Sequence, residues 1–208
     1  MFGGMVETVG SVAAVRDSEG VRELLIEAPE IATELRGGAS VAIDGACHTV
    51  TRVEGERFFV ESVTTTLSRT IAGTYQVGSR LNLERALAFG DRVDGHLVQG
   101  HVDAVGSLLA IEEDGQTRLM DFHLPPVVAA VTVLRGSIAI NGISLTVSTM
   151  PEPDICRVGV IPFTWEHTNL NALTLGAPVN LEGDLIGKHV GKMFAARDGE
   201  AHIEVREQ

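Results

Sequence analysis

Two short polar patterns place chemically capable side chains at matching positions. Cys47 and Thr49 follow an Asp-Gly pair, and Ser144 and Thr146 follow an Asn-Gly pair. A thiol or hydroxyl can act as a nucleophile or hydrogen-bond a ligand. Because side chains two residues apart on a strand share one face, each pair predicts a small polar site.

Each site residue has a structural alternative. A buried, inert thiol is the commoner role for a single cysteine on a strand, although hydroxyls at the matching positions favour a ligand site at Cys47. Cys156 has no polar counterpart in the other pattern, so we expect it in the core. Four threonines are either plain strand residues, which β-propensity favours, or ligand-facing groups: Thr64, Thr65, Thr66 and Thr164.

Two histidines, His96 and His101, lie five residues apart in the Gly-rich segment 95–101. That spacing matches neither one helix face nor one strand face, and no acidic or thiol ligand stands beside them at ligand spacing. A metal site is therefore disfavoured. His101 aligns with Met5 of the first half, so it is particular to the second. It either moves a proton or serves as a structural residue at a junction.

The patterns belong to an internal repeat. Gly45 aligns with Gly142, a shift of 97 residues (142 minus 45). Segments 4–12, 21–29, 60–70 and 77–84 match 100–108, 117–125, 158–168 and 175–182 in the same order. Such collinear self-similarity indicates a duplicated module. We expect one unit over 1–98, a second over 99–184, and a helix with a tail over 185–208.

Each copy predicts an all-β module. Short Val-, Ile-, Leu- and Thr-rich runs alternate with Gly, Asp and Pro at intervals typical of a barrel or sandwich. We expect about six strands per copy, closed on themselves to hide the sheet edges. The Asp-Gly and Asn-Gly turns predict hairpins over 38–51 and 136–148. Short helices are expected at 31–35 and 127–134, and an amphipathic tail helix carries a stripe of Ile186, Val190, Met193 and Phe194.

Composition limits the classes of partner. A formal charge of −12 argues against nucleic acid and anionic membranes. Two cysteines predict a reducing compartment, and the N-terminus lacks the features of a signal peptide. The sequence has no run of about 18 or more apolar residues, so we expect no membrane span. We therefore expect a cytoplasmic protein.

These motifs, in this order, resemble riboflavin synthase of the α-chain type over essentially the whole chain. The resemblance is carried by Met1-Phe2, GMVE, GASVAIDGACHTVT, LNLERAL, DGHLVQGHVD, NGISLTV and VNLEGD. It implies two tandem six-stranded Greek-key β-barrels with a C-terminal α-helix, assembled as a homotrimer. The implied reaction is a dismutation of two 6,7-dimethyl-8-ribityllumazine molecules. It yields riboflavin and 5-amino-6-ribitylamino-pyrimidinedione by four-carbon transfer, without cofactor or metal.

The resemblance also implies one lumazine per barrel, with a site where the first barrel of one subunit faces the second barrel of its neighbour. We expect His101 to help remove a proton from one 7-methyl group and Cys47 or a water to add to C7 of the other lumazine. Ser144 and Thr146 would orient the ligands. Holding two substrates face to face could supply roughly 7–11 kcal/mol of the barrier.

The pocket residues follow from the same resemblance. The first pocket would use Gly4, Met5, Val6, Ser40, Cys47, His48, Thr49, Glu61, Ser62, Val63, Thr64, Thr65 and Thr66. The second would use Gly100, His101, Val102, Ser144, Leu145, Thr146, Gly159, Val160, Ile161, Pro162, Phe163 and Thr164. Arg135 would reach a ligand held mainly by another subunit, and Asp184 would lie close to the site.

Four positions depart from the family pattern: Gly3, His48, Thr65 and Arg135 stand where threonine, leucine, glutamate and lysine are usual. The main alternative is a non-catalytic lumazine- or flavin-binding relative, such as the antenna proteins of luminous bacteria. Those lose the polar site residues, so Cys47 and His101 favour the enzyme. A double barrel without ligand is a third interpretation. A lumazine-synthase shell is a candidate partner.

Overall fold

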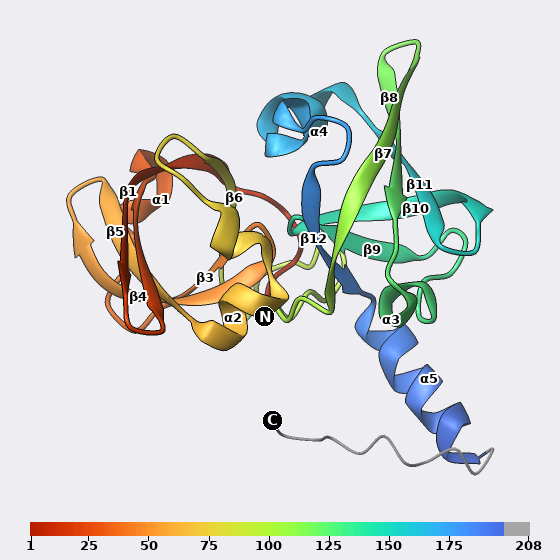
Figure 1. The fold of residues 1–208 in the computed structure, drawn as a ribbon, viewed down its shortest axis with the longest axis horizontal. Helices are drawn as coiled ribbons and strands as arrows, with labels where there is room; N and C mark the ends of the chain where they lie inside the picture. The colour runs from red at the N-terminus through yellow and green to blue at the C-terminus, as the bar shows by residue number, and fades with distance from the viewer. Residues whose placement is uncertain (198–208) are drawn as a thin grey trace.

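A computed structural model describes residues 1–197. Two closed barrels lie side by side, and one helix projects from the second (Figure 1). The strands of the first barrel are β1 (Thr8–Ser18), β2 (Val21–Glu27), β3 (Ser40–Ile43), β4 (Ala46–Glu54), β5 (Arg57–Val63) and β6 (Arg80–Arg85). Its helices are α1 (Pro29–Ala32), α2 (Thr64–Arg69) and the 3-10 helix η1 (Ile71–Thr74).

The second barrel repeats this element order. Its strands are β7 (Ala104–Asp114), β8 (Thr117–His123), β9 (Ser137–Ile140), β10 (Ile143–Glu152), β11 (Ile155–Val160) and β12 (Pro178–Gly183). Its helices are α3 (Pro126–Ala129), α4 (Pro162–His167) and the 3-10 helix η2 (Asn169–Ala172), and α5 (Leu185–Arg197) follows.

Both barrels close in the same strand order. The first runs β1-β2-β5-β4-β3-β6, and the second has the equivalent cyclic order β7-β8-β11-β10-β9-β12. In the first barrel the β1–β2 hairpin lies between β6 and β5, and in the second barrel the β7–β8 hairpin lies between β12 and β11. All strand pairs are antiparallel. The all-β class with six strands per copy and a C-terminal helix is confirmed.

The two central hairpins meet where the barrels touch. Asp44 and Gly45 have φ of 45° and 78°, and Asn141 and Gly142 have 46° and 77°. Positive φ at both central positions is the geometry that the two dipeptides predicted. A Cβ added to Gly45 would lie 2.6 Å from the backbone nitrogen of Gly142, and the reverse holds. Only glycine therefore lets the hairpins approach this closely.

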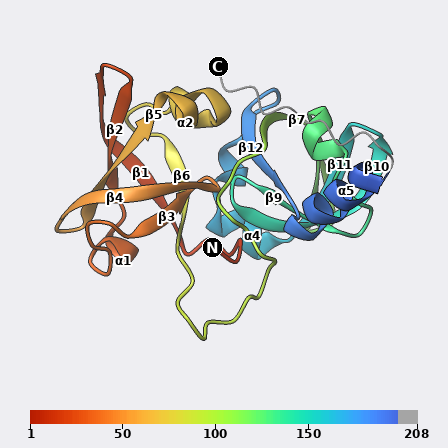
Figure 2. The ribbon, with the colours of Figure 1, turned by 90° about the horizontal axis from the view of Figure 1, so that it is seen from below.

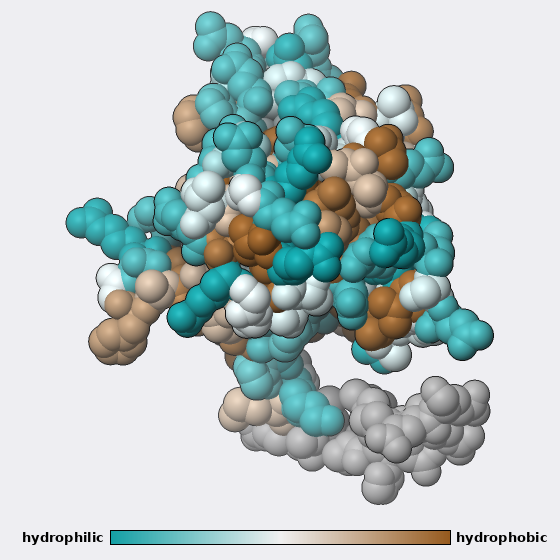
Figure 3. All heavy atoms as spheres, turned by 90° about the vertical axis from the view of Figure 1, so that its left-hand side faces the viewer, coloured by the Kyte–Doolittle hydropathy of each residue, from teal (hydrophilic) through white to brown (hydrophobic). Residues whose placement is uncertain are grey.

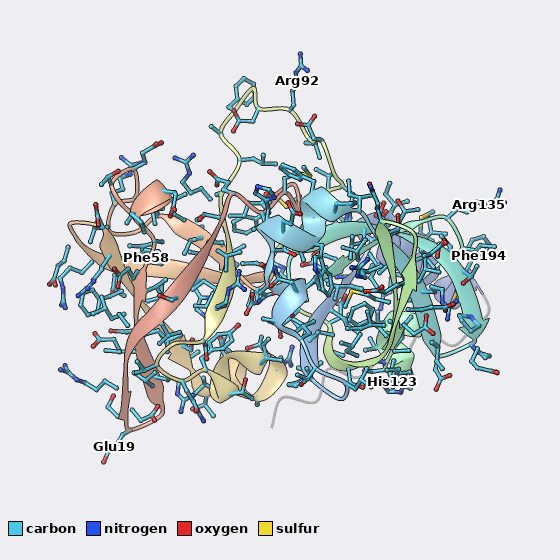
Figure 4. The ribbon with its side chains drawn as sticks, turned by 90° about the horizontal axis from the view of Figure 1, so that it is seen from above. Glu19, Phe58, Arg92, His123, Arg135 and Phe194 are labelled. Carbon is cyan, nitrogen blue, oxygen red and sulfur yellow. The ribbon has the colours of Figure 1, made fainter. Side chains whose placement is uncertain are left out.

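Alternation along the strands separates core from site. In β4, His48 and Val50 are buried while Thr49 is exposed and Cys47 is half-buried. The first core is built around residues such as Ile26 and Phe58, the latter seen inside its barrel in Figure 4. Cys156 is fully buried in the second core, as predicted.

A buried polar network joins the barrels. The Asp44 carboxylate accepts hydrogen bonds from the Tyr75 hydroxyl (2.8 Å), the Asn82 backbone N–H (2.8 Å) and the Asn169 side-chain amide (2.8 Å). Asn169 belongs to the second barrel, and Asn180 on β12 returns a bond to the Asp44 carbonyl oxygen (2.8 Å). The hairpin turn of the first barrel is therefore fixed by groups of both.

Local predictions fail where strands end. The strand assignment of Thr64, Thr65, Thr66 and Thr164 is wrong, because β5 ends at Val63 and the chain turns into α2, while Pro162 begins α4. Proline suits a first helical position because it has no N–H to leave unpaired. The short helices α1 and α3 cover fewer residues than expected, four each.

Two further segments complete the chain. The connector between the barrels loops outward before returning to them (Figure 2). Helix α5 ends at Arg197, and the predicted tail over 198–208 lies outside the described residues.

Within residues 1–197, no helix is long and apolar enough to cross a membrane. The surface at the first-barrel end is largely hydrophilic, as the net charge leads one to expect (Figure 3).

Candidate ligand-binding grooves

Each barrel receives the segment that precedes the other barrel. The Ser144 backbone N–H donates to the Gly4 carbonyl (2.8 Å), and the Cys47 N–H donates to the Gly100 carbonyl (2.8 Å). Val6 packs against the second core, and Val105 packs against the first. The segment before the first barrel therefore contacts the second barrel, and the segment before the second barrel contacts the first.

This exchange corrects the predicted pockets. Gly4, Met5 and Val6 were expected in the first-barrel pocket, and Gly100, His101 and Val102 in the second. The structure reverses the assignment for all of these residues except Met5: a Cβ on Gly100 would lie 2.6 Å from Cys47 Cβ, and one on Gly4 would lie 2.7 Å from Ser144 Cβ. Met5 lines a cavity with Ser40 of the first barrel. The cause is tertiary. The segment before each barrel packs against the central hairpin of the other barrel, and local sequence does not encode that contact.

Two buried glutamates hold the exchanged segments. Glu182 on β12 accepts from the backbone N–H groups of Gln99 (2.8 Å), Gly100 (3.0 Å) and His101 (3.0 Å). Glu84 on β6 accepts from the Gly3 N–H at 2.6 Å. Burial raises the pKa of Glu182 and raises the pKa of Glu84 to about 7, against the opposing effect of these hydrogen bonds.

The first groove brings Cys47 and His101 together. It has a volume of about 470 Å³ and is lined by Ala46, Cys47, Thr65, Thr66, Arg69, Thr70, Gly100, His101 and Val102. Cys47 is half-buried and His101 is exposed. A thiol at the floor and an imidazole at the rim can therefore face one ligand.

The strand face beside this groove carries more of the predicted residues. Ser40 pairs with Thr49 across β3 and β4, and Glu61 and Val63 on β5 are exposed. By contrast, His48 and Ser62 point into the barrel, where His48 Nε2 lies 2.9 Å from Ser62 Oγ. Burial lowers the pKa of His48 and keeps its ring neutral. These two side chains cannot reach a ligand on the outer face.

The surface around Ser144 takes the place in the second barrel that Cys47 takes in the first, and we call it the second groove by that equivalence. Ser144 is half-buried and Thr146 exposed on β10, while Gly159, Ile161, Pro162 and Phe163 are exposed and Thr164 is half-buried. The Phe163 ring stacks on His167 with centroids 4.1 Å apart. Leu145 and Val160 face the core, as their counterparts His48 and Ser62 do.

His96 is a site residue that sequence reasoning weighed only as a metal ligand. Its Nδ1 lies 2.7 Å from Ser144 Oγ. Burial lowers the pKa of His96, Asp184 opposes that shift and Lys188 adds to it. The spacing of the histidines carried no signal for this contact, because His96 reaches Ser144 across 48 residues of sequence.

Two predicted residues lie at the edge of the second barrel. Arg135 is exposed at a left-handed φ of 62° and points away from the barrel (Figure 4). Asp184 precedes α5, where its Oδ1 accepts from the Ile186 N–H at 2.9 Å. Asp184 faces His96, whereas Arg135 contributes to neither groove within this chain.

A larger cavity lies under the connector. It has a volume of about 830 Å³ and lies between the segment that follows α1, the strands β3 and β6, and the connector, with Met5, Ser40, Arg36, Arg85 and Arg92 among its lining groups. Five acidic side chains also line it: Glu7, Glu34, Glu84, Asp91 and Asp94. Within residues 1–197, no group of three or more His, Cys, Asp or Glu side chains could hold a metal ion.

Comparison with known proteins gives a consistent result. The family model for the lumazine binding domain matches residues 3–86 and 99–184. Riboflavin synthase of Mycobacterium tuberculosis is 38% identical over 197 residues, covering 93% of this chain and 98% of the relative. Riboflavin synthase of Bacillus subtilis is 34% identical over 190 residues, covering 91% and 88%.

The fold has a solved counterpart. The crystal structure of LumP complexed with riboflavin has a TM-score of 0.82 at 23% identity and covers 88% of this chain and 99% of that one. At this identity the likeness establishes the fold alone, whereas the lumazine-domain match and the curated relatives span nearly the whole sequence. The chain belongs to the riboflavin synthase family of lumazine-binding enzymes.

Proposed function

We propose that the protein forms riboflavin from two molecules of 6,7-dimethyl-8-ribityllumazine. One lumazine transfers a four-carbon unit to the other, and 5-amino-6-ribitylamino-pyrimidinedione is released. The two substrates contain all atoms of the two products, so no further reactant is required. The observation that carries this proposal is the groove that Cys47 and His101 share, together with the equivalent position of Ser144 on the second barrel.

The two grooves would treat identical substrates differently. Cys47, half-buried in the first groove, would add to C7 of the lumazine seated there, or orient a water that does. His101 is exposed at the rim, so it would reach a second lumazine stacked on the first and remove a proton from its 7-methyl group. Ser144 and Thr146 would hydrogen-bond and orient this second ring.

The complete site would require two subunits. Thr49 and Thr146 are exposed on the outer barrel faces, so a lumazine in the first groove of one copy would stack on a lumazine held beside Ser144 of a neighbour. We propose residues 1–98 and 99–184 as the two binding units of a cytoplasmic homotrimer, with α5 as its contact and a lumazine-synthase shell as a candidate partner. The exposed face of Ile186, Val190, Met193 and Phe194 supports that role of α5.

A non-catalytic lumazine- or flavin-binding protein is the second candidate. The likeness to LumP, whose structures were solved with riboflavin and with the lumazine, favours it at the level of fold. The enzyme is preferred because a thiol and an imidazole share the first groove, where a carrier has no use for a proton-transfer group.

Incubation with the lumazine separates these functions. The enzyme produces riboflavin fluorescence that grows with time, whereas a carrier only shifts the substrate spectrum. Cys47→Ser and His101→Gln are each expected to lower kcat by about 10²-fold or more, as loss of a positioned acid, base or nucleophile does. Wild-type rates in both variants would rule out the roles assigned here.

A further inference from the structure

The Ser144–His96 pair has no equivalent in the first barrel. His96 lies in the connector, and within residues 1–197 no histidine ring hydrogen-bonds Cys47 as His96 does Ser144. The His96 N–H donates to the Gly3 carbonyl (3.2 Å), and Ser144 N–H donates to Gly4. Both partners are therefore anchored on one short segment.

The geometry fixes the imidazole against the serine. A Cβ added to the neighbouring Gly95 would lie 2.8 Å from Ser144 Oγ, so the connector backbone is in direct contact with the hydroxyl. His96 is only 9% exposed. Its Nδ1 lies 2.7 Å from Ser144 Oγ, a normal hydrogen-bond length for a ring nitrogen and a hydroxyl.

Burial of the other ring nitrogen selects the tautomer. Within residues 1–197, His96 Nε2 is the one buried side-chain nitrogen or oxygen that no protein group hydrogen-bonds. Buried N–H groups without an acceptor are rare in folded proteins because such a group loses its hydrogen bond to water. With the proton of the neutral ring on Nδ1, no N–H is buried without an acceptor and Nδ1 donates to Ser144 Oγ. Asp184 and Lys188 are the charged groups that face this ring.

We propose that His96 is a positioning residue of the second groove. By donating to Ser144 Oγ, it leaves the Ser144 hydroxyl proton free to donate to an acceptor atom of the bound ligand, a carbonyl oxygen or an unprotonated ring nitrogen. Lumazines and flavins carry both kinds of acceptor. The identity of the ligand rests on the proposed function; the direction of the hydrogen bond rests on the burial of Nε2 and is independent of that function.

Asparagine and aspartate at position 96 test the direction of this bond. The side-chain amide introduced by His96→Asn can still donate to Ser144, whereas the carboxylate introduced by His96→Asp can only accept and so reverses the hydroxyl. Calorimetric titration with riboflavin is expected to give wild-type affinity within about threefold for His96→Asn and a loss of about tenfold or more for His96→Asp, confined to one of the two sites per chain.

The same pair in a Ser144→Ala background isolates the serine. Without the hydroxyl, His96→Asn and His96→Asp should bind riboflavin within about twofold of each other, because the coupling between the positions is gone. Equal affinities in the Ser144 background, or a difference that persists undiminished in Ser144→Ala, would overturn the proposal. Should His96→Asp fold poorly, His96→Leu replaces it. His96→Leu should weaken riboflavin binding when Ser144 is present and should not weaken it further in the Ser144→Ala background. Equal effects in both backgrounds would overturn the proposal.

The control and the readout keep the two proposals apart. His123→Gln removes another imidazole of the second barrel, with a 43% exposed side chain outside both grooves, and should leave binding and kcat unchanged. Wild-type protein that binds riboflavin but converts no lumazine would end the proposed function, while the titrations would still decide the role of His96.

Discussion

At the scale of single residues, Asp44 is the most unusual group outside the grooves. Burial raises its pKa from 3.8 to about 7, although three donors hold its carboxylate. The folded state therefore binds more protons than the unfolded state between these pH values. The stability contributed by the protonated form is present below pH 4 and is lost as the pH rises through 7.

Asp44→Asn should remove this dependence. The amide keeps an oxygen acceptor for Asn82 and Asn169, and the Tyr75 hydroxyl can rotate to accept from its N–H. The variant should unfold with a free energy roughly 1–4 kcal/mol higher than the wild type at about pH 8, and the gain should shrink towards about pH 5. Urea unfolding at both pH values measures it; a gain that is larger at the lower pH contradicts the assignment.

A second residue-level prediction concerns Glu182. Its carboxylate accepts three backbone N–H groups of segment 99–101, and an amide oxygen in Glu182→Gln can replace only part of that pattern. His101 should then be held less firmly, and kcat should fall about tenfold with little change in KM, since a small misplacement is costly in catalysis. Steady-state riboflavin formation measures both constants, and a wild-type kcat would show that the segment needs no such anchor.

Sequence reasoning reached some of these residues and not others. The internal repeat predicted that Cys47 and Ser144 occupy equivalent positions, and they do. The family resemblance placed His48 and Ser62 in the pocket, although alternation with Cys47 and Thr49 puts His48 on the opposite face of its strand. His96 was considered only as a metal ligand, and its contact with Ser144 was missed because the two residues are 48 positions apart in sequence.

At the scale of elements, the turns predicted the hairpins because Asp-Gly and Asn-Gly tolerate the required φ values. Strand number also followed from pattern. The crossover of segments 3–6 and 99–105 did not, since nothing local says which barrel a preceding segment will join. The helices α2 and α4 were missed for a related reason. β-branched threonines favour a strand, but these residues follow the end of β5 or β11, where no neighbouring strand pairs with them.

The contact between hairpins gives an element-level test. Gly45→Ala introduces a methyl 2.6 Å from the Gly142 nitrogen, in addition to a disfavoured φ of 78°. Gly55 has a φ of 62° with nothing within 4 Å, so Gly55→Ala is the matched control for φ alone. We expect Gly55→Ala to lower the unfolding free energy by about 1 kcal/mol and Gly45→Ala by at least ~2 kcal/mol more. Equal costs in urea unfolding would mean that the hairpins separate freely.

At the scale of the whole molecule, α5 leaves an apolar stripe uncovered. Ile186, Val190 and Met193 are 68%, 45% and 69% exposed, while Lys192 lies off that stripe. Ile186→Asp with Val190→Asp should convert the proposed trimer to monomer at micromolar concentration, because charged groups would be desolvated at the contact. Lys192→Asp is the control. Light scattering after gel filtration reports the mass, and an unchanged mass would place the contact elsewhere.

The central claim is that each reaction site combines the first groove of one copy with the second groove of another. One variant, Cys47→Ser with His101→Gln, disables the first groove; the other, Ser144→Ala with Thr146→Val, disables the second. Each alone should form little riboflavin. After co-refolding in equal amounts, random trimers should recover roughly one quarter of wild-type activity, because about one in four sites then receives two intact grooves. Activity no greater than the sum of the separate variants would contradict the account.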